Sequence, residues 1–162
     1  MTTLEPSISR AVSPYRNMCA NRRLILVDIE NMAQGPAMTA TTVESMRHIL
    51  ADTIDVGPWD QVVIGCSHVS LLAAMVGWPG ARFVVRSGPD GADRALLEVL
   101  DDDSASRFAG LVLVSGDHIF APALARTSMR TTVVSHRTSL SARLRIAASS
   151  VIFLPAAEAE AA

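Results

Sequence analysis

Lysine is missing from this sequence, because all 14 basic residues are arginine. A Walker A phosphate loop needs a lysine, and a pyridoxal enzyme holds its cofactor on one, so both chemistries are excluded. Cysteine is nearly as scarce: Cys19 and Cys66 are too few for a disulfide scaffold or a four-sulfur zinc site. Aromatic residues make up only 4% of the chain, which leaves little for platforms on which bases stack.

Long apolar runs are absent as well. No stretch of the sequence approaches the ~18 uninterrupted apolar residues of a membrane-spanning helix, so we expect no membrane segment. The first 20 residues contain charges and prolines and have no continuous apolar core, so they do not resemble a secretory signal. A cytoplasmic protein is therefore expected. With 162 residues, 49% of them hydrophobic, the chain suffices for one globular domain.

Apolar segments of strand length alternate with amphipathic segments of helix length, as is typical of a parallel sheet covered on both faces. Strands are expected at residues 24–28, 61–66, 82–85, 111–115, 131–136 and 151–154. Helices are expected at about 42–53, 92–100, 120–127 and 139–148, with another around 71–76 that stops near Gly77. We therefore predict a three-layer α/β sandwich with a central, mostly parallel sheet in residues 22–155. A flexible arm at 1–21 and a solvated tail at 156–162 would flank it.

Local patterns add predictions about single side chains. Ser67 follows the second strand and is expected to cap the next helix. Trp59 and Trp78 border turns and are expected to pack. Four apolar residues of the helix at 42–53 share one face and are expected to be buried: Val43, Met46, Ile49 and Leu50.

Three aspartates stand where a ligand site is expected. Asp28 closes the first strand, Asp117 follows the fourth, and Asp93 lies in the first turn of the helix after the GPDG turn at 88–91. In open parallel sheets, ligands bind beyond the carboxyl ends of the strands, near the point where the strand order reverses. Carboxylates that converge there repel one another unless a cation neutralises them, and oxygen ligands favour Mg²⁺ or Mn²⁺. Because a single aspartate is as often a turn or cap residue, the prediction depends on all three.

Motifs at the same positions resemble a known family. The string VDIENM at 27–32 is similar to the Asp-x-x-Asn opening of NYN domains, which have the PIN-like ribonuclease fold. LVSGDHIFAPAL at 113–124 is similar to their Ser-Gly-Asp-x-Asp-Phe block, and GPDGADRALLEVL at 88–100 to their segment with an aspartate before an amphipathic helix. The resemblance covers roughly residues 22–155. It implies a Mg²⁺- or Mn²⁺-dependent endoribonuclease whose metal ligands are Asp28, Asp93 and Asp117, with Asn31 orienting the site and Ser115 supporting it.

The mechanism implied is in-line attack on a phosphodiester by a metal-activated water. The family block carries a second acid two residues after the first, and here that position is Ile119. One ligand is therefore missing, and Glu30 would point to the same side as Asp28 only if the first strand continues past Asp28. A catalytically degenerate RNA-binding or scaffolding module of the same fold stays open as the alternative. A phosphatase or phosphoacceptor domain is a third possibility, but it would ordinarily use a lysine near its aspartate, and this sequence has none.

Candidate substrate contacts surround the three aspartates. Arg86 ends the third strand and is placed to bind a phosphate, and His118 is placed to contact a phosphate or move a proton. Ser115 completes this group. Arginines at 137, 143 and 145 are a candidate RNA track, and His68 is a weaker candidate; for all of these a solvated or packing role is the alternative. The expected partner is RNA, single-stranded or structured, with a second copy or a protein regulator as further candidates.

Overall fold

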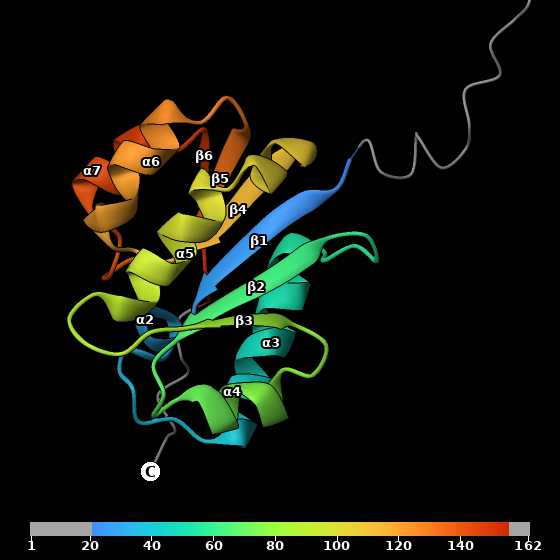
Figure 1. The fold of residues 1–162 in the computed structure, drawn as a ribbon, viewed down its shortest axis with the longest axis vertical. Helices are drawn as coiled ribbons and strands as arrows, with labels where there is room; N and C mark the ends of the chain where they lie inside the picture. Colours follow the sequence, from blue (N-terminus) through green and yellow to red (C-terminus); the bar gives the residue numbers. More distant parts are fainter. Residues whose placement is uncertain (1–20, 156–162) are drawn as a thin grey trace, which may run out of the picture.

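The computed structural model describes residues 21–155 and contains a six-stranded sheet with helices on both of its faces (Figure 1). All but the last residue of the predicted arm, and the whole predicted tail, lie outside the described residues. The strands are β1 (Arg23–Asp28), β2 (Gln61–Cys66), β3 (Arg82–Val85), β4 (Gly110–Val114), β5 (Arg130–Ser135) and β6 (Ser150–Phe153). The α-helices are α2 (Ile29–Ala33), α3 (Ala40–Ile54), α4 (Leu71–Gly77), α5 (Gly91–Asp101), α6 (Ala121–Arg126) and α7 (Ala142–Ala147). Two 3₁₀ helices complete the set, η1 (Asp103–Arg107) and η2 (His118–Phe120).

Every strand pair in the sheet is parallel, and the order is β3-β2-β1-β4-β5-β6. The chain builds one half of the sheet outward from β1 and then returns to add β4 on the other side of β1. The strand order therefore reverses between β1 and β4, which is where doubly wound folds form their ligand crevice. The predicted three-layer α/β class is correct, and the sheet is entirely parallel.

The two faces of the sheet have separate apolar cores because successive side chains of a strand alternate between them. Ile25 and Val27 of β1 pack with Val43 and Leu50 of α3 in one core. Leu24 and Leu26 face the other side and pack in a second core with side chains of α5, α6 and α7. Strand β1 is buried on both faces, as the continuous apolar run LILV predicts for a central parallel strand.

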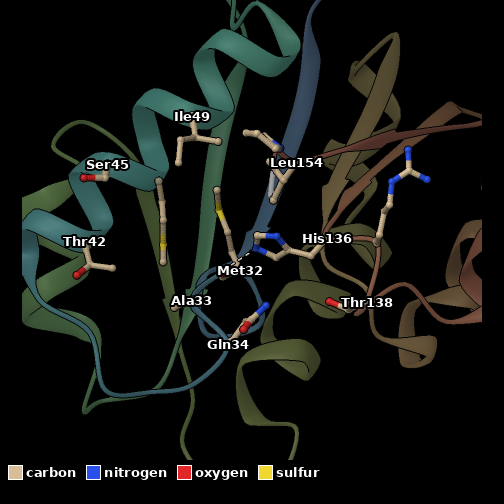
Figure 2. Close-up of a pocket in the computed structure, with 12 residues that line it drawn as sticks. Met32, Ala33, Gln34, Thr42, Ser45, Ile49, His136, Thr138 and Leu154 are labelled. Carbon is tan, nitrogen blue, oxygen red and sulfur yellow. Dashed lines mark hydrogen bonds between the residues drawn. The ribbon is translucent and has the colours of Figure 1, made fainter. Parts of the chain in front are cut away.

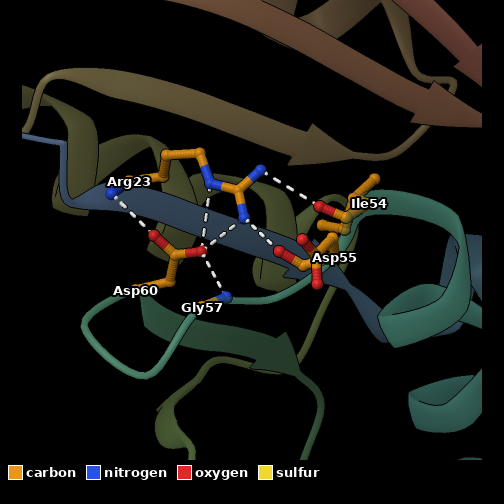
Figure 3. Close-up of polar contacts among 5 residues, drawn as sticks. All are labelled: Arg23, Ile54, Asp55, Gly57 and Asp60. Atoms are coloured by element: carbon orange, nitrogen blue, oxygen red, sulfur yellow. Dashed lines mark hydrogen bonds and ion pairs between the residues drawn. The ribbon is translucent and has the colours of Figure 1, made fainter.

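A polar network fastens the amino-terminal end of β1 (Figure 3). The Asp60 carboxylate accepts hydrogen bonds from the backbone N–H of Arg23 at 2.9 Å and from its guanidinium Nε at 3.0 Å. The same guanidinium donates to the carbonyl oxygens of Ile54 and Asp55, the last residue and the C-cap of α3. Burial alone would raise the pKa of Asp60, but the hydrogen bonds from Arg23 and Gly57 outweigh it and lower that pKa. The network joins β1, α3 and the start of β2 at the amino-terminal ends of these strands, opposite their carboxyl ends.

All of the predicted strands and helices are present, with limits that differ by up to three residues. Three short helices, α2, η1 and η2, were not predicted. The expected Ser67 cap is wrong: Ser70 is the N-cap residue of α4, and the backbone N–H of Ser67 donates instead to Glu30. Trp78 is buried as expected, whereas Trp59 is half exposed. Ile49 was also placed in the core but is 39% exposed, because it faces a cavity beside α3.

Candidate functional site

Asp28 lies where β1 turns into α2 and is buried beneath the surface, with 4% of the residue exposed. Its Oδ1 caps α2 by accepting a hydrogen bond from the Asn31 backbone N–H at 3.1 Å. Its Oδ2 accepts a hydrogen bond from the Ser115 hydroxyl at 3.0 Å. The carboxylate therefore links the ends of β1 and β4, the two strands at which the sheet order reverses.

Asp93 approaches Asp28 from the first turn of α5, on the opposite face of the sheet from α3. The two carboxyl groups share a hydrogen bond. Burial raises the pKa of Asp93, and the charge of Asp28 raises it further, to about 8, with smaller contributions from Asp117 and Asp90. Burial also raises the pKa of Asp28, although hydrogen bonds from Asn31, Asp93 and Ser115 oppose the change. At neutral pH the half-buried Asp93 therefore keeps its proton beside the buried carboxyl group of Asp28.

Asp117 follows β4 and caps η2, where its Oδ1 accepts a hydrogen bond from the Ile119 backbone N–H at 2.9 Å. The same oxygen lies 3.0 Å from Nδ1 of His118. Between β4 and Asp117, the Gly116 N–H donates to Oδ1 of Asn31 at 3.0 Å. A side chain at Gly116 would bring its Cβ within 2.2 Å of the Ser139 carbonyl oxygen, so this close approach requires glycine. Asn31 thus holds the loop after β4 against α2.

These acids line one small polar cavity of about 190 Å³ at the carboxyl ends of the strands. The predicted convergence of the three aspartates is therefore correct: residues from β1, α5 and the loop after β4 face the same space. Its lining residues are Asp28, Glu30, Asn31, Ser67, Arg86, Gly88, Asp90, Gly91, Ala92, Asp93 and Asp117.

The acids are of the kind that binds a divalent cation, but their present positions do not form a ready-made metal site. Within residues 21–155, no three His, Cys, Asp or Glu side chains are grouped as ready-made metal ligands. Asp28 and Asp93 hydrogen-bond each other instead, and Oδ1 of Asp117 caps η2. The buried carboxyl of Asp28 raises the pKa of the half-buried Asp93, and so does the nearby Asp117. Together they form an oxygen-donor set that a hard cation would neutralise.

Glu30 lies at the cavity but is committed to a structural contact. The strand ends at Asp28, so the condition for Glu30 to act as a fourth ligand is not met. Its Oε1 accepts hydrogen bonds from the backbone N–H of Ser67, at 2.9 Å, and from the Ser70 hydroxyl. Burial opposes ionisation of Glu30, but these two serines lower its pKa below the usual value. Sequence reasoning missed this link because its partners lie on another strand's loop.

The structure places the predicted substrate-binding residues in different surroundings. Arg86 lines the cavity, and its guanidinium also forms an ion pair with Glu98 at 2.8 Å. Ser115 is buried with its hydroxyl on Asp28, so it supports the site and is not placed to touch a substrate, which corrects the latter expectation. His118 is exposed beside Asp117 but does not line the cavity. His68 hydrogen-bonds the Ser87 hydroxyl.

A larger cavity of about 760 Å³ lies on the other side of α2 and was not predicted (Figure 2). Its lining is largely apolar and includes Met32, Met46, Ile49 and Leu154, with the His136 ring directed at the Met32 carbonyl oxygen at 3.1 Å. Arg137, from the predicted RNA track, lines it, but none of the three aspartates does. The small cavity is the better candidate for chemistry because it contains the acids whose pKa values are displaced, whereas the large one contains no acid.

No protein-family model and no curated protein sequence matches this chain. Among solved structures, the chain is similar to the crystal structure of a protein of unknown function from Vibrio parahaemolyticus, with 17% sequence identity and a TM-score of 0.54. The match covers 83% of this chain and 93% of that one. This similarity concerns the fold alone. The fold and the cavity define an α/β protein with an acidic centre at the reversal point of a parallel sheet. Among residues 21–155, no helix is long and apolar enough to cross a membrane.

Proposed function

We propose that this protein is a metal-dependent endoribonuclease whose catalytic centre is the cavity of Asp28, Asp93 and Asp117. The observation that carries the proposal is the contact between Asp28, buried at the end of β1, and Asp93, in the first turn of α5, whose carboxyl groups hydrogen-bond each other and both have raised pKa values. Such a pair weakens the fold unless a ligand uses it, so it is a mark of a functional site. The similarity of the segments at 27–32, 88–100 and 113–124 to NYN domains supports RNA as the substrate.

In this proposal Asp28, Asp93 and Asp117 hold Mg²⁺ or Mn²⁺. The cation supplies the activation of a water molecule and the neutralisation of phosphate charge. Loading requires that Asp93 release its proton and that Asp117 turn from the Ile119 N–H toward the cavity. The Ser115 hydroxyl and the Asn31 N–H keep Asp28 in place during this exchange.

Other residues of the chain would orient the RNA. Arg86 stands at the cavity, and its pairing with exposed Glu98 leaves it free to exchange that partner for a phosphate. Asn31 fixes the loop that carries Asp117 through the Gly116 N–H. A cytoplasmic location, where RNA is plentiful and thiols stay reduced, accompanies this proposal.

The proposal predicts cleavage of a labelled RNA in the presence of Mn²⁺ or Mg²⁺ and none in the presence of EDTA. Asp28→Asn, Asp93→Asn and Asp117→Asn should each lower the rate by about 100-fold or more, because each removes a charge that holds the cation. Asp52→Asn is the matched control, since Asp52 is an exposed acid on α3, away from the cavity. Gel assays with equal amounts of each purified variant provide the measurement.

Two results would contradict the proposal: wild-type protein that leaves RNA intact at all metal concentrations, or Asp28→Asn that cleaves as fast as Asp52→Asn. The second candidate function is an RNA-binding module of the same fold without turnover. Ile119 favours it, because this side chain packs against the core of α6 and α7 where the family pattern has an acid. That module would bind labelled RNA in EDTA and release it uncut after metal is added.

A further inference from the structure

We propose that two copies of this chain associate through α4 and the edge strand β3, forming one continuous sheet across a two-fold axis. This inference concerns a surface that the proposed catalytic centre does not use. It is independent of whether the protein cleaves RNA.

The first observation is an unpartnered apolar stripe on α4 and the turn before it. The stripe consists of Val69, Leu72, Met75 and Val76, which are 79%, 75%, 52% and 63% exposed. These four side chains lie on the side of the helix opposite buried Ala74 and Gly77. Single exposed apolar residues are ordinary on a protein surface, but three on one short helix and a fourth in the turn before it form a patch that marks an interaction site.

The helix that carries the stripe is firmly seated. A Cβ on Gly77 would lie 2.4 Å from the Ala40 carbonyl oxygen of α3, so the backbones of α3 and α4 are in close contact. The inward side chains Leu71 and Ala73 pack against the same core as Phe83 and Val85 of β3. Rotation of α4 to bury its stripe would break this packing. The stripe is therefore a fixed feature of the folded chain.

The second observation is the state of the adjacent sheet edge. Among residues 21–155, strand β3 pairs only with β2, and it lies at the same end of the molecule as α4 (Figure 1). Its sequence RFVV has three apolar residues, one charge and no proline, and Phe83, Val84 and Val85 are partly exposed. Natural edge strands are usually protected by charges, proline or bulges, because an open edge accepts another strand. This edge has little protection beyond Arg82.

A second copy of this chain can cover the apolar stripe on α4 and pair with the open edge of β3 at the same time. When two β3 strands pair antiparallel about a two-fold axis between Phe83 and Val84, Arg82 lies opposite Val85 of the partner subunit. The two arginines then stand at opposite ends of the pair and do not repel each other. A two-fold axis normal to the sheet also keeps both α4 helices on one face. Helix α4 contains no charged residue, so its stripe meets its own copy without like charges in contact.

The opposite end of the sheet lacks this combination, although β6 is also an edge strand. There the Arg137 guanidinium covers the Phe153 ring at 4.3 Å from its centroid. On α7 the exposed apolar residue Ile146 stands next to Arg145 and near Arg143, both exposed. Two copies that met through α7 would bring arginines together. This end supplies the matched control for the experiment.

The test is the mass of the full chain in solution, measured by analytical ultracentrifugation from about 1 to 100 µM. Wild-type protein is expected to reach twice the 17.2 kDa of one chain. Leu72→Arg and, separately, Val76→Arg should weaken association by about 100-fold or more, because each places a charge in the contact. Ile146→Arg, which alters an equally exposed apolar residue at the other end, should associate as the wild type does. Circular dichroism of each variant establishes that it is folded, and two α4 variants guard against a folding defect in one.

Amide hydrogen exchange tests the strand contact separately from the helix contact. As protein concentration rises, residues 82–85 of β3 should become more protected, whereas residues 150–153 of β6 should not change. The proposal is overturned by a wild-type chain that stays monomeric at 100 µM, by Ile146→Arg dissociating the pair as strongly as Leu72→Arg, or by a dimer in which β3 exchange is independent of concentration. A monomer would favour a different protein as the occupant of this surface.

Discussion

At the scale of single residues, the least favourable electrostatic contact at the candidate site is between the carboxyl groups of Asp28 and Asp93. Asp28 and Asp93 are held near each other by β1 and α5, and neither has a basic residue as a hydrogen-bond partner. Ser115, Asn31 and the hydrogen bond between the two carboxyl groups reduce the cost without removing it. Packing of the two elements therefore maintains an arrangement that the carboxylates by themselves would oppose.

This pair predicts a pH dependence of stability with a definite sign. The unfolded chain loses the Asp93 proton near the ordinary value of about 4, whereas the folded chain keeps it up to about pH 8. Between these values the folded state binds more protons, so the free energy of unfolding falls as pH rises. Asp93→Asn removes this penalty and should, in EDTA at pH 8, melt above the wild type by about 2–4 °C, equivalent to ~1 kcal/mol.

Thermal melts from pH 4 to pH 9 provide the measurement. The advantage of Asp93→Asn over the wild type should grow with pH, while Asp52→Asn should parallel the wild type throughout. A variant whose advantage is constant over this range would show that Asp93 ionises normally in the folded chain.

At the scale of elements, the Arg23–Asp60 network determines how β1 enters the sheet. Arg23→Ala leaves the Asp60 carboxylate without its guanidinium partner and frees the end of α3. We expect the free energy of unfolding at pH 7 to fall by about 1–3 kcal/mol, the usual range for hydrogen bonds to a charged group. Because the folded pKa of Asp60 is lowered, this contribution is present above about pH 4 and is lost as pH falls through the folded value.

Urea denaturation at pH 7 and pH 3 measures both parts of this expectation. The difference between Arg23→Ala and the wild type should shrink at the lower pH. Arg145→Ala, at an exposed position on α7, should differ little from the wild type at either pH. An equal loss of stability in the two variants would remove the special role given to Arg23.

The elements also show what the sequence could and could not predict. Strands β2 and β3 match their predicted limits, because continuous apolar runs bounded by turn residues identify buried parallel strands. Helix α2 has five residues, which is too few for a helical period, and it forms because Asp28 caps it. Ile49 has the correct spacing for burial but faces a cavity, and spacing alone does not reveal whether a neighbour is present.

For the candidate site, the sequence predicted which residues come together but not the contacts that their side chains make. The positions of Asp28 and Asp117 follow from parallel topology, and Asp93 follows from the helix start. Distances between side chains do not follow from topology, so the hydrogen bond between Asp28 and Asp93 and the turn of Asp117 toward η2 required coordinates. The commitment of Glu30 to Ser67 and Ser70 likewise depends on how the loops after β1 and β2 meet.

At the scale of the whole molecule, the acidic cavity should make folding stability depend on divalent metal. A ligand that binds only the folded state stabilises it by about 2.7 kcal/mol at 100 times its dissociation constant. Added Mn²⁺ should therefore raise the melting temperature of the wild type at pH 8, and less at pH 6, where Asp93 keeps its proton. Differential scanning calorimetry in Mn²⁺ and in EDTA measures the change.

Asp28→Asn is the discriminating variant for this prediction, because it removes the most deeply buried of the proposed ligands. Its melting temperature should respond little to Mn²⁺, and that of Asp52→Asn should respond fully. A similar rise in all three proteins would mean that Mn²⁺ acts at some other surface.

The insertion of β1 between β2 and β4 has a consequence for synthesis of the chain on the ribosome. Asp28 emerges early, but its neighbour β4 begins only at Gly110, and Asp117 comes later still. A partly made chain thus possesses separated acids and no assembled centre. If the protein cuts RNA, this order of emergence keeps a tethered, unfinished chain harmless to the messenger and ribosomal RNA beside it.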